Sequence, residues 1–136
     1  MADNFTFKDN RPAVMSRLDQ FVEKALTSAG MVLEANINPL IPVDTTALLI
    51  SLKYEVDISK KTMYIGVNEP YAIYVEFGTG VFAENGGGRK TPWWYKDEDG
   101  NWHRTIGQKP SRYMRGGYEN ARADVEKVVR QIFKGF

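Results

Sequence analysis

A long apolar stripe near the start of the chain places the strongest limit on the fold. Its members recur every three or four residues, which is the spacing of one face of an α-helix. They are Val14 or Met15, Leu18, Phe21, Val22, Ala25, Leu26, Ala29, Val32 and Leu33. Pro12 suits the first turn of a helix, and Pro39 disfavours helical dihedrals in the residue before it. We therefore expect one long helix between these prolines, whose apolar face the rest of the chain must cover.

An alternating pattern after this helix predicts a β-strand. The apolar members are Ile50, Leu52, Tyr54, Val56 and Ile58, with polar residues between them. Such alternation gives a strand one apolar face and one solvated face. Residues 59–62 suit a turn into a second strand over residues 63–67, so we expect an antiparallel hairpin. Pro70 near the start and Gly78 just past the end of the next apolar segment favour a short helix.

The glycine and aromatic content rises between residues 79 and 109. Residues 85–88 contain three glycines and are expected to form a loop, because glycine loses the most backbone entropy on ordering. Residues 92–95 and 102–104 are rich in aromatic side chains and flank an Asp-Gly turn. This arrangement predicts a second hairpin that protrudes from the domain.

The remaining residues predict a final helix that Pro110 and Ser111 open and Gly135 closes. Gly116 and Gly117 should weaken or bend its first part. We expect one α+β domain over residues 1–136, with a flexible tail at about 1–10 and an extended loop and hairpin at about 79–109. In this fold a small, mainly antiparallel sheet carries both long helices on one face.

Composition limits the chemistry. The net charge of +1 argues against a general binder of polyanions. No apolar run approaches the roughly 20 residues that span a bilayer, and the first residues do not resemble a signal peptide. The chain has no cysteine. We expect a protein made and folded in a cytosol, without a membrane partner.

Candidate catalytic and metal-binding residues are few. His103 is the single histidine, and beside a turn it is expected to be a solvated surface residue. Asp97, Glu98 and Asp99 could hold a calcium ion, but their spacing favours a hydrated turn. The glycines before Arg89 have the wrong spacing for a phosphate loop. We therefore predict no catalytic residue, no metal site and no cofactor.

The aromatic hairpin predicts a binding surface instead. Tryptophan, tyrosine and arginine are enriched at the centres of protein interfaces. The candidate interface residues are Arg89, Lys90, Trp93, Trp94, Trp102 and Arg104. We favour contact with protein, while stacking of nucleic-acid bases on these rings is the rival interpretation. In the simplest alternative, half of the rings face the core.

Charge is divided unevenly along the chain. Residues 34–84 contain seven acidic and three basic residues, a net of −4. Residues 89–115 contain seven basic and three acidic residues, a net of +4. Such patches can meet between copies in a head-to-tail ring, or they can pair within one chain.

Three segments together resemble one protein family. Residues 71–79 read Tyr-x-x-Tyr-Val-Glu-Phe-Gly-Thr, residues 42–51 contain Val-Asp-Thr followed by leucine and serine, and residues 107–115 form a proline-aromatic stretch. They are similar to the neck or tail-completion proteins of long-tailed phages. This family is typified by gene product ten of the HK-type lambdoid coliphages and includes proteins like minor tail protein Z. Thr46 and the Gly116–Gly117 pair depart from the family pattern.

The resemblance implies a non-enzymatic virion protein at the head–tail junction, made in the bacterial host's cytoplasm. It implies a ring of copies, most simply six, between the connector, the tail terminator and the tail tube, with DNA in the channel left open as a partner. The alternatives are the tail terminator itself and a nucleic-acid-binding protein. The signature residues that it marks are Asp44, Thr45, Tyr71, Tyr74, Glu76, Phe77, Gly78 and Thr79.

The signature also predicts local contacts. Tyr71, Tyr74, Val75 and Phe77 are expected to pack the short helix against the sheet. Glu76 is expected either to accept hydrogen bonds from the following loop or to cap a neighbouring subunit, and it joins Glu84 among the interface candidates.

Overall fold

Two long helices and two separate β-hairpins dominate the computed structural model, which describes residues 5–43 and 46–136. The elements in chain order are α1 (Arg11–Ile37), the 3-10 turn η1 (Asn38–Leu40), α2 (Thr46–Ser51), β1 (Lys53–Asp57), β2 (Thr62–Gly66), α3 (Ala72–Phe77), the 3-10 turn η2 (Gly80–Phe82), β3 (Trp93–Lys96), β4 (Trp102–Thr105) and α4 (Tyr113–Phe133). The predicted α+β class is confirmed, with the strands divided between two antiparallel two-stranded sheets.

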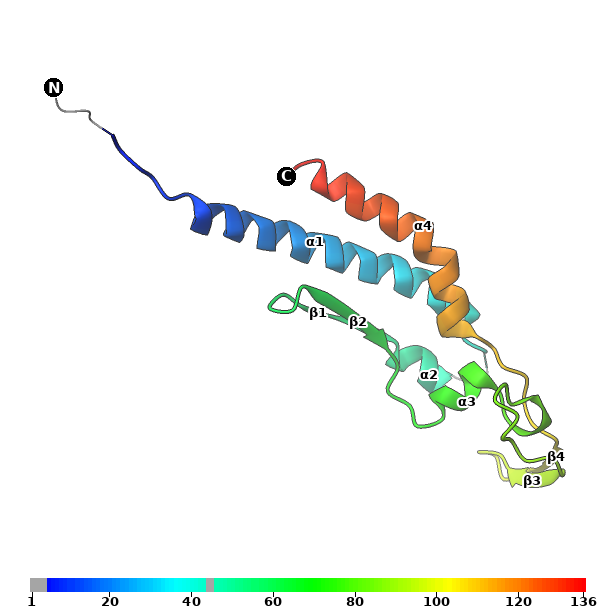
Figure 1. The fold of residues 1–136 in the computed structure, drawn as a ribbon. Helices are drawn as coiled ribbons and strands as arrows, with labels where there is room; N and C mark the ends of the chain where they lie inside the picture. Colours follow the sequence, from blue (N-terminus) through cyan, green and yellow to red (C-terminus); the bar gives the residue numbers. More distant parts are fainter. Residues whose placement is uncertain (1–4, 44–45) are drawn as a thin grey trace.

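Helix α1 is the central element of the fold. It begins one residue before Pro12 and ends two residues before Pro39, as its sequence predicts. Ala25, Ala29 and Leu33 are buried on one stripe, which continues to Ile37. Figure 1 shows α1 between the β1–β2 hairpin on one side and α4 on the other, and both contact it. The sequence predicted that both long helices lie on one face of the sheet. In the structure, α4 packs mainly on α1 and is separated from the hairpin by it.

The first predicted hairpin is confirmed, with one correction at its start. Strands β1 and β2 pair antiparallel, with Val56 opposite Met63. Ile50, however, was wrongly placed in the strand, because it lies in α2 and is 72% exposed. Leu48 and Leu52 are both buried four residues apart, and that helical spacing decides the local structure.

The core lies where the C-terminal end of α1 meets the start of α4. Its buried members are Leu33, Ile37, Ile41, Leu48, Leu52, Val75, Tyr113 and Ala121. Ile37 and Leu48 are fully buried. Residues from α1, α2, α3 and α4 therefore share one apolar cluster, which fixes the short helices to the long ones.

Helix α4 begins at Tyr113, slightly later than Pro110 and Ser111 predicted. Arg112 precedes it with φ of 54°, and this left-handed conformation cannot continue a helix. Gly117 has a packing role in the first part of α4, because a Cβ there would lie 2.7 Å from the Cα of Ile37. The glycine thus allows α4 to approach α1 closely.

The second hairpin is also confirmed and protrudes from the end of the molecule (Figure 1). Strands β3 and β4 pair with Trp94 opposite Arg104 and Lys96 opposite Trp102. No aromatic ring of this hairpin is buried, so the alternative in which half of its rings face the core is wrong.

Candidate functional site

The signature segment of residues 71–79 forms α3 and the turn after it. Val75 and Glu76 are buried, whereas Ile73 and Tyr74 are each 58% exposed and Phe77 is 43% exposed. The expectation that the signature aromatic residues pack α3 against the sheet is therefore wrong. Tyr71 is also at the surface. Among the four signature residues expected to pack there, only Val75 joins the core, and Ala72 of the same helix packs against it.

Gly78 ends α3 in the predicted positive-φ conformation, with φ of 82°. Its backbone N–H donates to the carbonyl of Tyr74 at 2.8 Å and closes the last turn. A Cβ at this position would lie 2.9 Å from the carbonyl oxygen of Phe82 and 2.9 Å from Cδ of Pro110. Both the dihedral angle and the surrounding backbone therefore select glycine.

A groove of about 600 Å³ lies beside the exposed face of α3. Its walls are mainly apolar and come from α3, from the loop after it and from the first residue of β3. The residues that line it are Ile73, Tyr74, Phe77, Gly78, Thr79, Gly80, Ala83, Glu84, Asn85, Gly87, Gly88, Arg89 and Trp93. Four signature residues thus line one groove, together with three of the predicted interface residues.

Hydrogen bonds hold the loop that forms the far wall of this groove. The N–H of Thr79 donates to the carbonyl of Gln108 at 2.9 Å, and the N–H of Val81 donates to that of Ile106 at 3.0 Å. Thr79 Oγ1 in turn accepts from the N–H of Gln108 at 2.9 Å. These bonds give Thr79 a structural role, since they tie the signature to the segment that leads into α4.

Glu76 caps the N-terminus of α4, a role that the residue just before a helix usually has. One carboxylate oxygen accepts the N–H of Met114 at 2.8 Å, and the other accepts the N–H of Arg115 at 3.2 Å. These are the second and third residues of α4, whose N–H groups have no partner within the helix. Arg112 provides no side-chain cap. Glu76 is 6% exposed and acts within its own chain, so we revise its predicted place among the interface residues.

Arg115 joins Glu76 to Glu84. Its Nε donates to Glu76 at 2.7 Å, its terminal nitrogen donates to Glu84 at 2.8 Å, and its guanidinium lies over the ring of Phe77 at 4.6 Å. Arg112 donates to the other Glu84 oxygen at 2.7 Å. The hydrogen bond from Arg115 is the main cause that lowers the pKa of Glu84, and bonds to Glu84 and Glu76 raise the pKa of Arg115. Part of the charge division along the sequence is therefore satisfied within one chain.

The β3–β4 hairpin presents one face that alternates tryptophan and cation. Alternate residues of a strand share a face, so Trp94, Lys96, Trp102 and Arg104 lie together on it. Trp94 is 62% exposed and Trp102 is 64% exposed. Lys96 lies 6.0 Å from the centre of the Trp102 ring. We call these four residues the cation–tryptophan face.

The other face of the hairpin carries a stacked aromatic pair and a histidine–aspartate contact. The rings of Tyr95 and His103 stack at 5.3 Å, and His103 Nε2 lies 2.6 Å from a carboxylate oxygen of Asp97. This bond is the largest cause of the lowered pKa of Asp97. His103 and Asp97 therefore contact each other across the β3–β4 turn. Across residues 5–43 and 46–136, no group of three His, Asp or Glu side chains is arranged to hold a metal ion.

Arg89 lines the groove, and Lys90 follows it in the segment that leads into β3. The guanidinium of Arg89 is 5.7 Å from the centre of the Trp93 ring and donates to Thr91 at 3.2 Å. Both cations are exposed, and neither forms an ion pair with a carboxylate in the part of the chain that the structure describes. The signature residues Asp44 and Thr45 lie outside the described residues.

These features place an apolar groove and a cationic aromatic hairpin at one end of the molecule, and both have the character of a protein-binding surface. A family model described as "Bacteriophage HK97-gp10, putative tail-component" matches residues 7–78. The match covers more than half of the 136 residues, and the chain belongs to this phage tail-component family. Comparisons with curated proteins and with solved structures gave no match.

The family match ends at Gly78, so it covers α1, the first hairpin and α3. The groove combines this matched part with residues 79–93, and the cation–tryptophan face lies wholly beyond it. Among the described residues, no helix is long and apolar enough to cross a membrane.

Sequence reasoning missed two parts of the site. It did not single out Ile73, which lines the groove, or Arg115, which connects the two glutamates. Ile73 lies four residues before Phe77, so the two share one face of a helix. This spacing could have identified Ile73 from the sequence. No local signal indicated Arg115, because its partners are 39 and 31 residues away.

Proposed function

We propose that this chain is a non-enzymatic ring subunit that completes the phage tail and joins it to the head at the neck. The observation that carries the proposal is the outward direction of the family signature. Ile73, Tyr74 and Phe77 leave the core and line a groove, although burial of such side chains normally stabilises a fold. Exposed apolar groups gathered in one place are typical of an interaction surface.

The cation–tryptophan face supplies a second contact surface in this proposal. Within the described residues, Arg89, Lys90, Lys96, Arg104 and Lys109 form no ion pair. The carboxylates Glu55, which is exposed, and Glu34 and Glu69, which are half-buried, form none in these residues either. Cations on the hairpin and carboxylates elsewhere in the chain suit a head-to-tail contact between copies. We propose that about six copies form the ring and that the connector, tail terminator and tail tube are its neighbours.

One observation favours a second candidate function, nucleic-acid binding. Two exposed tryptophans alternate with two cations on the cation–tryptophan face, an arrangement that can stack bases and contact phosphates. Binding of this kind weakens steeply as salt concentration rises. Titration of the purified chain with DNA at several salt concentrations distinguishes the two functions, because our proposal requires no such binding.

A phage that lacks the gene tests the proposal. We expect it to accumulate filled heads and tails of normal length that remain unjoined, and the gene supplied in trans should restore joined particles. Electron microscopy reads both outcomes. Tails of uncontrolled length would indicate a tail terminator instead, and normal infectious particles would contradict both junction roles.

A further inference from the structure

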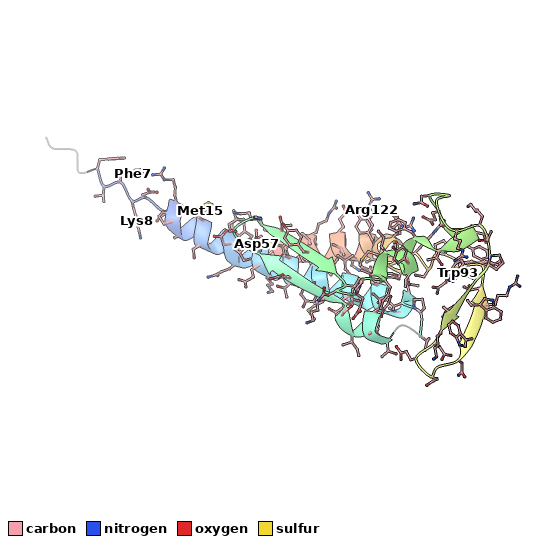
Figure 2. The ribbon with its side chains drawn as sticks, turned by 90° about the horizontal axis from the view of Figure 1, so that it is seen from below. Phe7, Lys8, Met15, Asp57, Trp93 and Arg122 are labelled. Atoms are coloured by element: carbon pink, nitrogen blue, oxygen red, sulfur yellow. The ribbon has the colours of Figure 1, made fainter. Side chains whose placement is uncertain are left out.

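Two apolar features that the described residues leave uncovered lie at opposite ends of this molecule. One is the arm, which we define as residues 5–10 and which forms no helix or strand. It carries Phe5 and Phe7, which are 85% and 77% exposed. The other is the groove beside α3. Figure 2 shows Phe7 and Lys8 at one end of the molecule and Trp93, at the edge of the groove, at the other.

The arm presents its two phenylalanines in a regular way. In an extended chain, residues two apart point to the same side and lie roughly 7 Å from each other. An extended arm would therefore carry Phe5 and Phe7 on one side and Thr6 and Lys8 on the other. At the base of the arm, Arg11 donates to both carboxylate oxygens of Asp9 at 2.7 to 3.1 Å, and both side chains are exposed. An extended arm would thus carry an apolar side and a polar side.

The groove offers a matching surface. Ile73, Tyr74 and Phe77 expose apolar atoms on one wall, and Trp93 lies at the other. Its volume of about 600 Å³ falls within the range of about 300–1,000 Å³ that holds compact ligands in proteins. Two phenylalanine rings are a suitable content for it, since each can bury about 150–250 Å².

The arm cannot reach the groove of its own chain. Helix α1 has 27 residues and is therefore about 40 Å long at about 1.5 Å per residue. The arm begins at the N-terminal end of α1, whereas α3 and β3, which line the groove, lie beyond its C-terminal end (Figures 1 and 2). Six extended residues span about 20 Å at most. An arm that fills the groove must therefore come from another copy.

We propose that Phe5 and Phe7 of one copy occupy the groove of the next copy, against Ile73, Tyr74 and Phe77. The donor surface and the acceptor surface lie at different ends of one chain, so each contact leaves another arm and another groove free. Contacts of this head-to-tail kind close into a ring when the rotation permits. The inference rests on the proposed ring function and assigns its subunit contact.

Photocrosslinking in assembled tails tests the contact. The photoreactive aromatic residue p-benzoyl-phenylalanine is placed at position 7 of the full chain, and mass spectrometry identifies the peptide that it captures. We expect capture within residues 73–93 of a second copy and a ladder of dimers, trimers and larger products. The same probe at Lys8, on the opposite side of the arm, should capture this segment at least tenfold less.

A variant of the groove provides the matched control. Ile73→Glu should lower the capture from position 7 at least tenfold, whereas Ile50→Glu should leave it unchanged. Both are exposed isoleucines on short helices, but only Ile73 lines the groove. If Ile73→Glu prevents tail assembly, Asn85→Arg on the opposite wall serves the same purpose.

The outcomes separate this contact from the function on which it rests. Dimers without larger products would support docking between copies but contradict a head-to-tail ring. Capture of another tail protein, of residues outside the groove, or of nothing in correctly assembled tails would overturn the arm contact. The ring function would then still stand, since joined particles measure it independently.

Discussion

Replacement of Glu76 by alanine should destabilise the whole fold, although the residue lies next to the proposed interface. The change removes the acceptor for the N–H groups of Met114 and Arg115 at the start of α4. It also removes the carboxylate that Arg115 contacts at 2.7 Å. Because α4 packs along α1 and supplies Tyr113 and Ala121 to the core, an end of α4 that frays exposes the centre of the structure.

The expected loss follows from these contacts. Removal of a helix cap costs about 1 kcal/mol, and the favourable position of a carboxylate at a helix N-terminus adds about 0.3–1 kcal/mol. A buried hydrogen bond to a charged group adds about 1.5–3 kcal/mol. Since the guanidinium of Arg115 is partly exposed and can regain water, we take the lower end of this range. The free energy of unfolding should therefore fall by about 3 kcal/mol.

Urea denaturation followed by circular dichroism measures this loss. At a slope of about 2 kcal/mol per M, the unfolding midpoint of Glu76→Ala should fall by about 1.5 M. Glu84→Ala is the matched control, because it removes ion pairs to the same Arg115 and to Arg112 but no backbone cap. Its midpoint should change much less, since Glu84 lies nearer the surface. Equal midpoints for Glu76→Ala and the unchanged protein would refute the capping role.

Three further predictions concern Gly78, the Arg89–Lys90 pair and Asp97. Gly78→Val should lower the free energy of unfolding by about 3 kcal/mol, because φ is 82° and a Cβ would meet backbone at 2.9 Å; thermal melts measure it. Reversal of Arg89 and Lys90 to glutamate should reduce joined particles at least about tenfold without unfolding the chain, because like charges at an interface cost several kcal/mol. Acid should loosen the β3–β4 hairpin, because the pKa of Asp97 is lowered below its usual value of 3.8 in the folded chain. The Asp97 carboxylate therefore stabilises the hairpin fully at pH values above 3.8, and this stabilisation is lost as the pH falls below that value. Tryptophan fluorescence between about pH 6 and about pH 2 follows this change.

Each of these changes has a control. Gly66→Val introduces the same side chain where a Cβ meets nothing within 4 Å, so it should cost much less than Gly78→Val. Reversal of two exposed cations on α4, Arg122 and Lys127, should leave joining intact; equal defects would mean that net charge matters and the position does not. In Asp97→Asn the acid-induced change in fluorescence should disappear.

The sequence predicted the elements that local patterns determine. The stripe of α1, the alternation of β1 and the aromatic segments of β3 and β4 each contain enough residues to show a period. Helix α2 was missed because Ile50 and Leu52 fit the alternation of the following strand as well as they fit a helix. The burial of Leu48 and Leu52 with Ile50 exposed distinguishes a helix from a strand here, and that burial depends on the tertiary structure.

The candidate site was only partly predictable. A positive φ at Gly78 follows from the local sequence, because glycine just past a short apolar segment is a common helix end. The outward direction of Tyr74 and Phe77 does not follow from it, since periodicity shows that a face is apolar but not what covers it. The partners of Glu76 lie 38 and 39 residues away, and only the packing of α4 on α1 brings them together.

Reconstruction of the head–tail junction by cryo-electron microscopy tests the central claim most directly. Our account predicts a closed ring of this chain between connector and tail, in which each copy contacts the next through α3, the groove and the β3–β4 hairpin. The exposed faces of Ile73, Tyr74 and Phe77 should be covered there. A junction that lacks this chain, or that leaves these side chains exposed to solvent, would contradict the account.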